Sequence, residues 1–201
     1  MEIQHLLDLS SRDHSHLCPR QILGVRMALA GMKALGFDTP PDKKQLLIIT
    51  ETDGCFVDGI TAATKCAVGH RTLRVEDYGK VAATFVDLKT ERAVRVAPVL
   101  EIRQKAYAYA PAEPRHYFAQ MTAYQIMPDD EMFTITEVQL STPIEVIVSR
   151  PGMRVNCEVC GEEIMNEREI KQHGLTLCRA CAGTSYYRLP VPLHLLENTI
   201  A

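Results

Sequence analysis

The chain has 201 residues, of which 46% are hydrophobic and 23% are charged, a composition that excludes a disordered or low-complexity protein. Its formal net charge of −3 gives no strong electrostatic case for binding nucleic acid or anionic lipid. No apolar run approaches the roughly 18 to 20 residues that span a bilayer, and the N-terminus lacks the features of a signal peptide. We therefore expect a cytoplasmic protein that does not cross a membrane.

Two helices are predicted before the first strand. The stretch 2–9 carries three leucines, and Pro19 suits the first position of a longer, mostly buried helix that ends near Gly36. The continuous apolar run 46–50 predicts a buried central strand, and 55–65 predicts a further helix.

Short strands and then two helices follow. Turn residues separate three strand-like stretches, which we expect to pair in sequence order as a meander. Runs of strands with helices apart from them favour an α+β fold, with a mixed or antiparallel sheet core packed with helices, over a doubly wound parallel sheet. The predicted strands span 72–76, 80–88, 91–97 and 132–140, and the helices span 99–109 and 115–127.

A turn signal at Pro151-Gly152 marks a change in composition. We place a domain boundary there, between a core domain of residues 1–150 and a small module of residues 151–201. The sequence shows no internal repeat and no glycine-rich phosphate loop, and Gly79-Lys80 lacks the upstream glycine of a Walker motif. Nucleotide binding is therefore disfavoured.

Four of the seven cysteines form a C-x2-C-x17-C-x2-C pattern in the small module. This spacing is typical of a structural zinc site, because two thiolates in one tight turn can meet a tetrahedral ion at about 2.3 Å. Zinc enclosed by four thiolates has no open position, so we expect it to be structural. The ligand type leaves a rubredoxin-like iron site or an iron–sulfur cluster open. The predicted ligands are Cys157, Cys160, Cys178 and Cys181.

A second group of metal-binding residue types surrounds the starts of two predicted helices. A thiol at a helix start has a lowered pKa, which favours the thiolate that binds metal or attacks carbon. If the segment before Pro19 is extended, its histidines and cysteine project to one side. The best ligand candidates are His16, Cys18 and Cys55, and further candidates are His14, Asp58 and Cys66, although Cys66 also suits a buried core position.

Three functions remain open for these residues. A core zinc with three protein ligands could leave a position for water or substrate, with Lys80 and Asp77 as charge partners. Alternatively, Cys18 or Cys55 is a metal-free nucleophile with His16 as its base. Lys80 completes the candidate catalytic set. In the third alternative, the protein is a non-enzymatic binding or assembly factor whose finger docks a protein partner.

The motifs resemble those of the FmdE family, which is named after formylmethanofuran dehydrogenase. Residues 14–20, His-Ser-His-Leu-Cys-Pro-Arg, resemble a family signature His-Gly-His-x-Cys-Pro-Gly that opens a helix, except that Ser15 and Arg20 replace its glycines. The stretches 55–60, 62–66 and 77–85 follow in the family's order. The four-cysteine tail resembles the treble-clef finger attached to some members.

The resemblance implies an α+β core, a homodimer, and a cleft lined by the His and Cys residues. It also implies a role accessory or related to one-carbon (formylmethanofuran) metabolism, since the redox chemistry of that dehydrogenase belongs to its other polypeptides. The module 151–201 holds five Lys or Arg against six Asp or Glu. We therefore expect its partner to be a protein and not nucleic acid.

Overall fold

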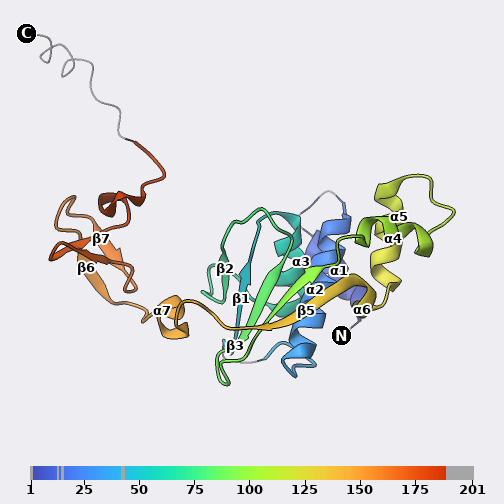
Figure 1. Ribbon diagram of the computed structural model, residues 1–201, viewed down its shortest axis with the longest axis horizontal. Coiled ribbons are helices and arrows are strands. Elements are labelled where there is room, and N and C mark those ends of the chain that lie inside the picture. The colour runs from blue at the N-terminus through green and yellow to red at the C-terminus, as the bar shows by residue number, and fades with distance from the viewer. Residues whose placement is uncertain (1, 13, 15, 42–43, 189–201) are drawn as a thin grey trace, which may run out of the picture. The chain divides into compact units, whose positions relative to one another are not determined.

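The computed structural model describes residues 2–12, 14, 16–41 and 44–188 (Figure 1). The chain divides into two compact units, Met1–Ser141 and Thr142–Ala201. The boundary expected after residue 150 falls within the second unit, just after a short helix, α7 (Ile144–Val148), that the sequence pattern did not indicate.

The first unit is built on one five-stranded sheet in the order β2-β1-β3-β4-β5. Only β1 and β2 are parallel, and the other neighbours are antiparallel. This mixed sheet with its helices confirms the α+β class. The strands are β1 (Leu46–Thr50), β2 (Leu73–Val75), β3 (Ala83–Asp87), β4 (Ala93–Pro98) and β5 (Phe133–Val138).

The predicted three-stranded meander is wrong in one pairing, because β2 pairs with β1 and not with β3. The reason lies in the connection between β1 and β2, which runs through the helix α3 (Cys55–Thr64). A helical crossover returns the chain parallel to the strand it left, whereas tight turns make antiparallel pairs. The segment between β2 and β3 then passes β1, which lies between them.

The helix α2 (Pro19–Ala34) lies at the centre of the unit. Eleven of its sixteen residues are buried, which fits apolar residues distributed around its whole circumference. It packs against the sheet, where a side chain on Gly31 would collide with the Phe85 ring, and against the helices α1 (Ile3–Ser11) and α3.

Two glycines let α2 and α3 touch backbone to backbone. A Cβ atom on Gly24 would lie 2.1 Å from the carbonyl oxygen of Phe56, and one on Gly59 would lie 2.2 Å from that of Gln21. Gln21 and Phe56 both belong to the first turn of their helices. The close approach therefore brings the starts of α2 and α3 together.

Three further helices complete the first unit: α4 (Ile102–Tyr109), α5 (His116–Ile126) and α6 (Asp129–Met132). Arg26 on α2 anchors the end of α5, because its guanidinium donates hydrogen bonds to the carbonyl oxygens of Tyr124 and Met127 and to Asp129 at 2.7 to 2.8 Å. This fixes α5 against α2.

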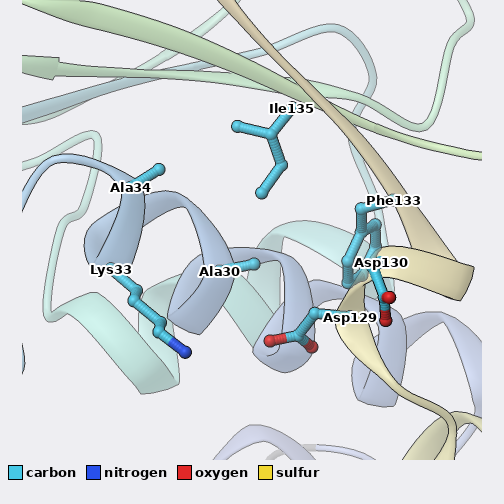
Figure 2. Close-up of a pocket in the computed structure, with 7 residues that line it drawn as sticks. All are labelled: Ala30, Lys33, Ala34, Asp129, Asp130, Phe133 and Ile135. Atoms are coloured by element: carbon cyan, nitrogen blue, oxygen red, sulfur yellow. The ribbon is translucent and has the colours of Figure 1, made fainter.

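The sheet ends at β5, whose middle residues are exposed. Beside this edge, α2, α6 and β5 enclose a cavity of about 540 Å³ (Figure 2). Its walls combine small and apolar side chains with one cation and two carboxylates: Ala30, Ala34, Phe133, Ile135, Lys33, Asp129 and Asp130.

After α7, the second unit contains two small hairpins and a short helical segment. The hairpins pair β6 (Arg154–Asn156) with β7 (Glu163–Met165) and β8 (Ile170–Gln172) with β9 (Leu175–Leu177), and η1 (Ala180–Thr184) follows. Up to residue 188, where the described part of the unit ends, its buried hydrophobic residues are Cys157, Ile164 and Leu177. In neither unit does any described helix have the length and apolarity required to span a membrane.

Candidate functional site

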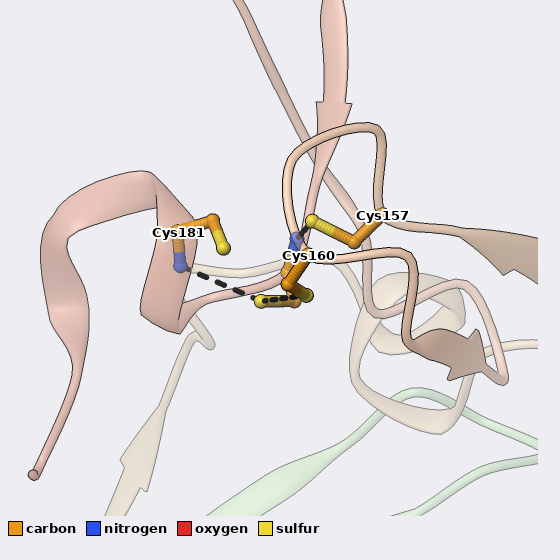
Figure 3. A group of neighbouring side chains, drawn as sticks. Cys157, Cys160 and Cys181 are labelled. Carbon is orange, nitrogen blue, oxygen red and sulfur yellow. Dashed lines mark hydrogen bonds between the residues drawn. The ribbon is translucent and has the colours of Figure 1, made fainter. Parts of the chain in front are cut away.

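The four cysteines predicted as zinc ligands converge in the second unit (Figure 3). Their sulfur atoms all lie within 4.8 Å of one another, and those of Cys160 and Cys178 are 3.9 Å apart. A tetrahedral ion with bonds of about 2.3 Å places its ligands about 3.8 Å apart. The observed set therefore fits one zinc ion, and it supports a structural zinc finger.

The thiols of this cluster differ in pKa. Backbone N–H groups of Cys160 and Cys178 donate to the sulfur of Cys157 and lower its pKa to about 6. In contrast, the pKa of Cys181 is raised, first by its hydrogen bond with the Cys178 thiol and then by burial. Four thiolates this close repel one another, and a bound dication offsets that repulsion.

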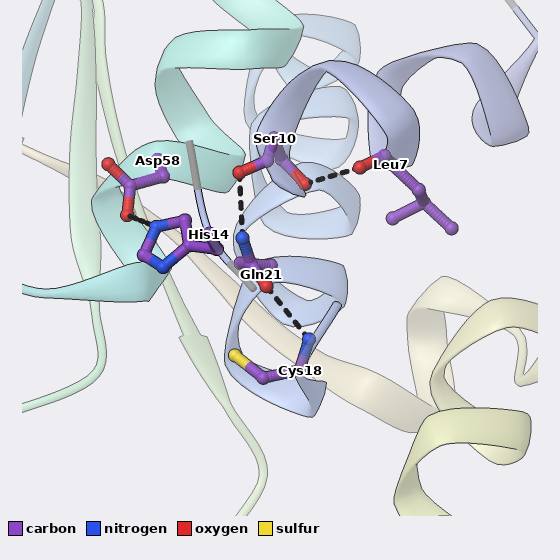
Figure 4. A network of polar contacts seen from close by, with 6 residues as sticks. All are labelled: Leu7, Ser10, His14, Cys18, Gln21 and Asp58. Carbon is purple, nitrogen blue, oxygen red and sulfur yellow. Dashed lines mark hydrogen bonds and ion pairs between the residues drawn. The ribbon is translucent and has the colours of Figure 1, made fainter. Parts of the chain in front are cut away.

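In the first unit, His14, Cys55 and Asp58 form a second group whose ligand atoms lie within 4.8 Å of one another. Cys55 begins α3, and Asp58 lies three residues later on the same helix face. His14 comes from the segment between α1 and α2, and its Nε2 lies 2.9 Å from Oδ2 of Asp58 (Figure 4). Nitrogen, sulfur and oxygen donors thus meet at the start of α3.

Cys18 is held beside this group by a buried glutamine. Its backbone N–H donates to Oε1 of Gln21 at 2.8 Å, and Nε2 of Gln21 donates to the Ser10 carbonyl oxygen at 2.7 Å (Figure 4). The pKa of Cys55 is raised by burial, then by the nearby charge of Cys18 and a hydrogen bond with its thiol. The two thiols that begin α2 and α3 are therefore neighbours.

The structure places the other sequence candidates away from this group. His16 is exposed and lies outside the cluster of His14, Cys55 and Asp58. Cys66 follows the far end of α3, about 15 Å along a ten-residue helix from Cys55, and its buried thiol donates to the Leu46 carbonyl oxygen at 3.5 Å.

Lys80 also lies apart from the thiols. Its ammonium group is 6.0 Å from the centre of the Tyr78 ring. The pKa of Glu51 is lowered mainly by its hydrogen-bonded ion pair with Arg95, and the charge of Lys80 adds to this effect. Asp77 accepts a hydrogen bond from the backbone of Gly79 within the same turn. These residues thus organise the turn before β3.

Tyr117 on α5 is a site residue that the sequence analysis missed. Its hydroxyl donates to the Leu17 carbonyl oxygen at 3.4 Å, next to Cys18. Burial, and then the charges of Cys18 and Cys55, raise the pKa of this phenol, so it remains protonated beside them. Only the packing of α5 against α2 brings it there, and no local pattern around Tyr117 indicates this.

Two protein families match the chain. Residues 14–134 match the family described as FmdE, molybdenum formylmethanofuran dehydrogenase operon, and residues 152–187 match the prokaryotic dksA/traR C4-type zinc finger. The first match covers more than half of the chain and includes the core cluster. The second includes all four cysteines of the finger, which confirms the predicted zinc-finger type of site.

Two known proteins are similar over most of the chain. A probable S-adenosyl-L-methionine-binding protein of Archaeoglobus fulgidus is 31% identical over 208 residues, which cover 92% of this chain and 54% of that protein. The chain thus spans about half the length of this curated relative. The crystal structure of a tungsten formylmethanofuran dehydrogenase FmdE-like protein from Syntrophus aciditrophicus has a TM-score of 0.61 at 22% identity, covering 94% of this chain and 96% of that one. The second similarity supports the fold.

Proposed function

The chain belongs to the FmdE family, and on this basis we propose that its core holds a second metal ion, a zinc, besides the structural zinc of the finger. The observation that carries the proposal is the convergence of His14, Cys55 and Asp58, with Cys18 adjacent. Imidazole and thiolate donors suit zinc. His14, Cys18 and Cys55 would be its protein ligands, and Asp58 would orient His14 through the observed contact.

Such a site would have a free coordination position, whereas the zinc of the finger has all four positions filled by cysteines. Three protein ligands leave one position for water or substrate, and zinc so bound lowers the pKa of water to about 7 or polarises a carbonyl group. The chain's own groups around that position have distinct tasks. Asp58 holds the His14 ring, Gln21 fixes the backbone of Cys18, and the Tyr117 hydroxyl donates its proton to the Leu17 carbonyl oxygen and so holds the segment just before Cys18.

The raised pKa of Cys55 favours metal binding over the metal-free nucleophile. An activated cysteine nucleophile needs a lowered pKa, whereas burial and the neighbouring Cys18 raise that of Cys55. A zinc ion would reverse this effect, because coordination deprotonates a thiol. Together with the match to the FmdE family, the site supports our proposal of a metal-dependent role accessory or related to one-carbon (formylmethanofuran) metabolism.

Metal content tests the core site directly. The full chain loaded with zinc and then freed of excess metal should contain two equivalents, and Cys55→Ser should contain about one, because removing a thiolate ligand weakens the core site. Inductively coupled plasma mass spectrometry measures both. Cys66→Ala is the matched control and should keep two equivalents, since Cys66 lies at the far end of α3. One equivalent in the unmodified chain, or two in Cys55→Ser, would contradict the proposal.

We further propose that the protein is a homodimer joined along β5. Within the described residues β5 pairs only with β4, so one row of its backbone groups faces outward at the sheet edge. A second copy related by a two-fold axis can pair antiparallel with the same strand. The cavity beside β5 also offers Lys33 opposite Asp129 and Asp130, charges that a two-fold partner can match.

Ile135→Lys should convert this dimer to a monomer, because it places a charge in the apolar contact at the centre of the edge. Size-exclusion chromatography with light scattering measures the mass. Ile126→Lys, at an exposed position on α5, is the control and should remain dimeric. A monomeric unmodified chain, or an unchanged mass for Ile135→Lys, would rule out this interface.

For the second unit we propose a treble-clef finger that contacts a protein partner. The hairpin around Cys157 and Cys160, the β8–β9 hairpin and the short helix that carries Cys181 follow the treble-clef order. The near balance of five basic and six acidic residues in 151–201, plus the formal −2 of a four-thiolate zinc, disfavours phosphate binding. Exposed Val159 and Tyr186 suit an apolar contact. None of the seven cysteines, all of which lie in the described residues, is in a disulfide, and we propose a cytoplasmic location.

A further inference from the structure

We propose that the cavity beside the core cluster binds a small molecule through an oxyanion, a carboxylate or a phosphate, that contacts Arg12 and Lys65. The inference rests on the proposed function in one respect: the bound anion would present its other end to the core metal. It adds the chemical class of the ligand. The cavity measures about 280 Å³ and lies between α1 and α3.

The cavity is continuous with the proposed metal site. His14 and Asp58, which belong to the core cluster, line it directly. Thr61 and Lys65 extend the same wall, because they follow Asp58 at helical spacing on one face of α3. A molecule in this cavity therefore touches the residues that surround the metal. The remaining lining residues are Leu9, Ser10, Arg12 and Ala62.

The charges of the cavity favour an anion. Arg12 ends α1 and Lys65 ends α3, and within the described parts of the chain neither makes an ion pair. Three other arginines of the first unit have ion pairs in the described residues, namely Arg26 with Asp129, Arg92 with Glu137 and Arg95 with Glu51. The carboxylate that lines the cavity, Asp58, contacts His14.

Both cations line the cavity. Guanidinium and ammonium groups are the side chains that bind carboxylates and phosphates, with charge-assisted hydrogen bonds. The backbone at Lys65 adopts a left-handed conformation, φ 62°, where glycine is the usual residue at a helix end. The cavity's volume suits a small metabolite or the acidic end of a longer one, since pockets for drug-sized ligands span about 300 to 1,000 Å³.

A cation at the C-terminal end of a helix also stabilises that helix, which is a competing reason for Arg12 and Lys65. The two explanations differ in what an anion does. Helix stabilisation is independent of added ligand, whereas a binding site gives saturable affinity that disappears with the two cations. The test must therefore measure binding and not only melting.

Isothermal titration of the full zinc-loaded chain, at constant ionic strength, measures binding of inorganic phosphate and of succinate separately. We expect at least one probe to bind saturably, and the double variant Arg12→Gln/Lys65→Gln to weaken it about tenfold or more. The control Lys89→Gln/Arg103→Gln removes two exposed cations elsewhere and should bind as the unmodified chain does. Tighter phosphate binding would identify a phosphate ligand, and tighter succinate binding a carboxylate.

Failure of both probes to bind, or equal weakening by both double variants, would overturn the inference. The zinc content of the same samples shows whether the anion site or the core metal site is the proposal that has failed. A chain that holds two zinc equivalents but no anion contradicts only the anion site. A chain that holds one equivalent, yet loses anion affinity in Arg12→Gln/Lys65→Gln, supports the anion site and contradicts the core metal.

Discussion

Replacing Cys157 with serine is expected to release the zinc of the finger and unfold the second unit, while the first unit stays folded. Among the residues that the structure describes, the buried hydrophobic core of the second unit consists of Cys157, Ile164 and Leu177, too few residues to hold two hairpins together. Structural zinc contributes on the order of 10 to 16 kcal/mol in zinc-finger peptides, so its loss removes the dominant stabilising interaction. Amide hydrogen exchange should show lost protection across 152–187 and unchanged protection in β1, β3 and β4.

The neighbouring variant Val159→Ser is the control for this prediction. Val159 lies between two ligands in the same turn, but its side chain is 64% exposed and takes no part in the cluster. This variant should keep the zinc and its protection from exchange. The account of the finger fails if Cys157→Ser retains its zinc, or if the second unit stays protected after the zinc has been removed.

Gly59→Ala is expected to destabilise the first unit more than an ordinary surface substitution does. The added Cβ would lie 2.2 Å from the Gln21 carbonyl oxygen, and a backbone atom in a packed helix cannot move away cheaply. Overpacking of this kind costs about 1 to 3 kcal/mol and occasionally more, and we expect at least about 3 kcal/mol here. Urea unfolding followed by circular dichroism measures the loss in the free energy of unfolding.

The same variant should also weaken the core metal site. Separating α2 from α3 moves Cys18 away from Cys55, so the folded fraction of Gly59→Ala should bind less than one core equivalent of zinc. Gly69→Ala is the matched control, because a Cβ there meets no atom within 4 Å, and it should change the free energy of unfolding by less than about 0.5 kcal/mol. Equal stability of Gly59→Ala and Gly69→Ala would show that the two helices do not approach as described.

Local sequence patterns predicted those features that are determined by residues close together in the chain. The run 46–50 coincides with β1, and Pro19 begins α2, because both signals are written in a few consecutive residues. The four-cysteine cluster was likewise predicted from spacing alone. The partner of β2 could not be predicted this way, since a three-residue strand, Leu73–Val75, carries no information about which neighbour it pairs with.

The sequence indicated which residue types would gather at the starts of α2 and α3, but it did not indicate which histidine would lie among them. Helix starts drew attention to Cys18 and Cys55, and the proximity of these two residues depends on two glycines whose role is visible only in the packing. The preference for His16 over His14 assumed an extended segment with alternating side chains. Both histidines lie at bends of the chain, so the alternation does not apply, and His14 is the histidine in the cluster.

Element-specific X-ray scattering from crystals of the zinc-loaded chain, recorded on both sides of the zinc absorption edge, tests the central claim most directly. Two anomalous peaks per chain are predicted, one among Cys157, Cys160, Cys178 and Cys181 and the other at the start of α3, beside the cluster of His14, Cys55 and Asp58. A single peak, confined to the finger, would contradict the core metal site and leave the starts of α2 and α3 as a packing contact.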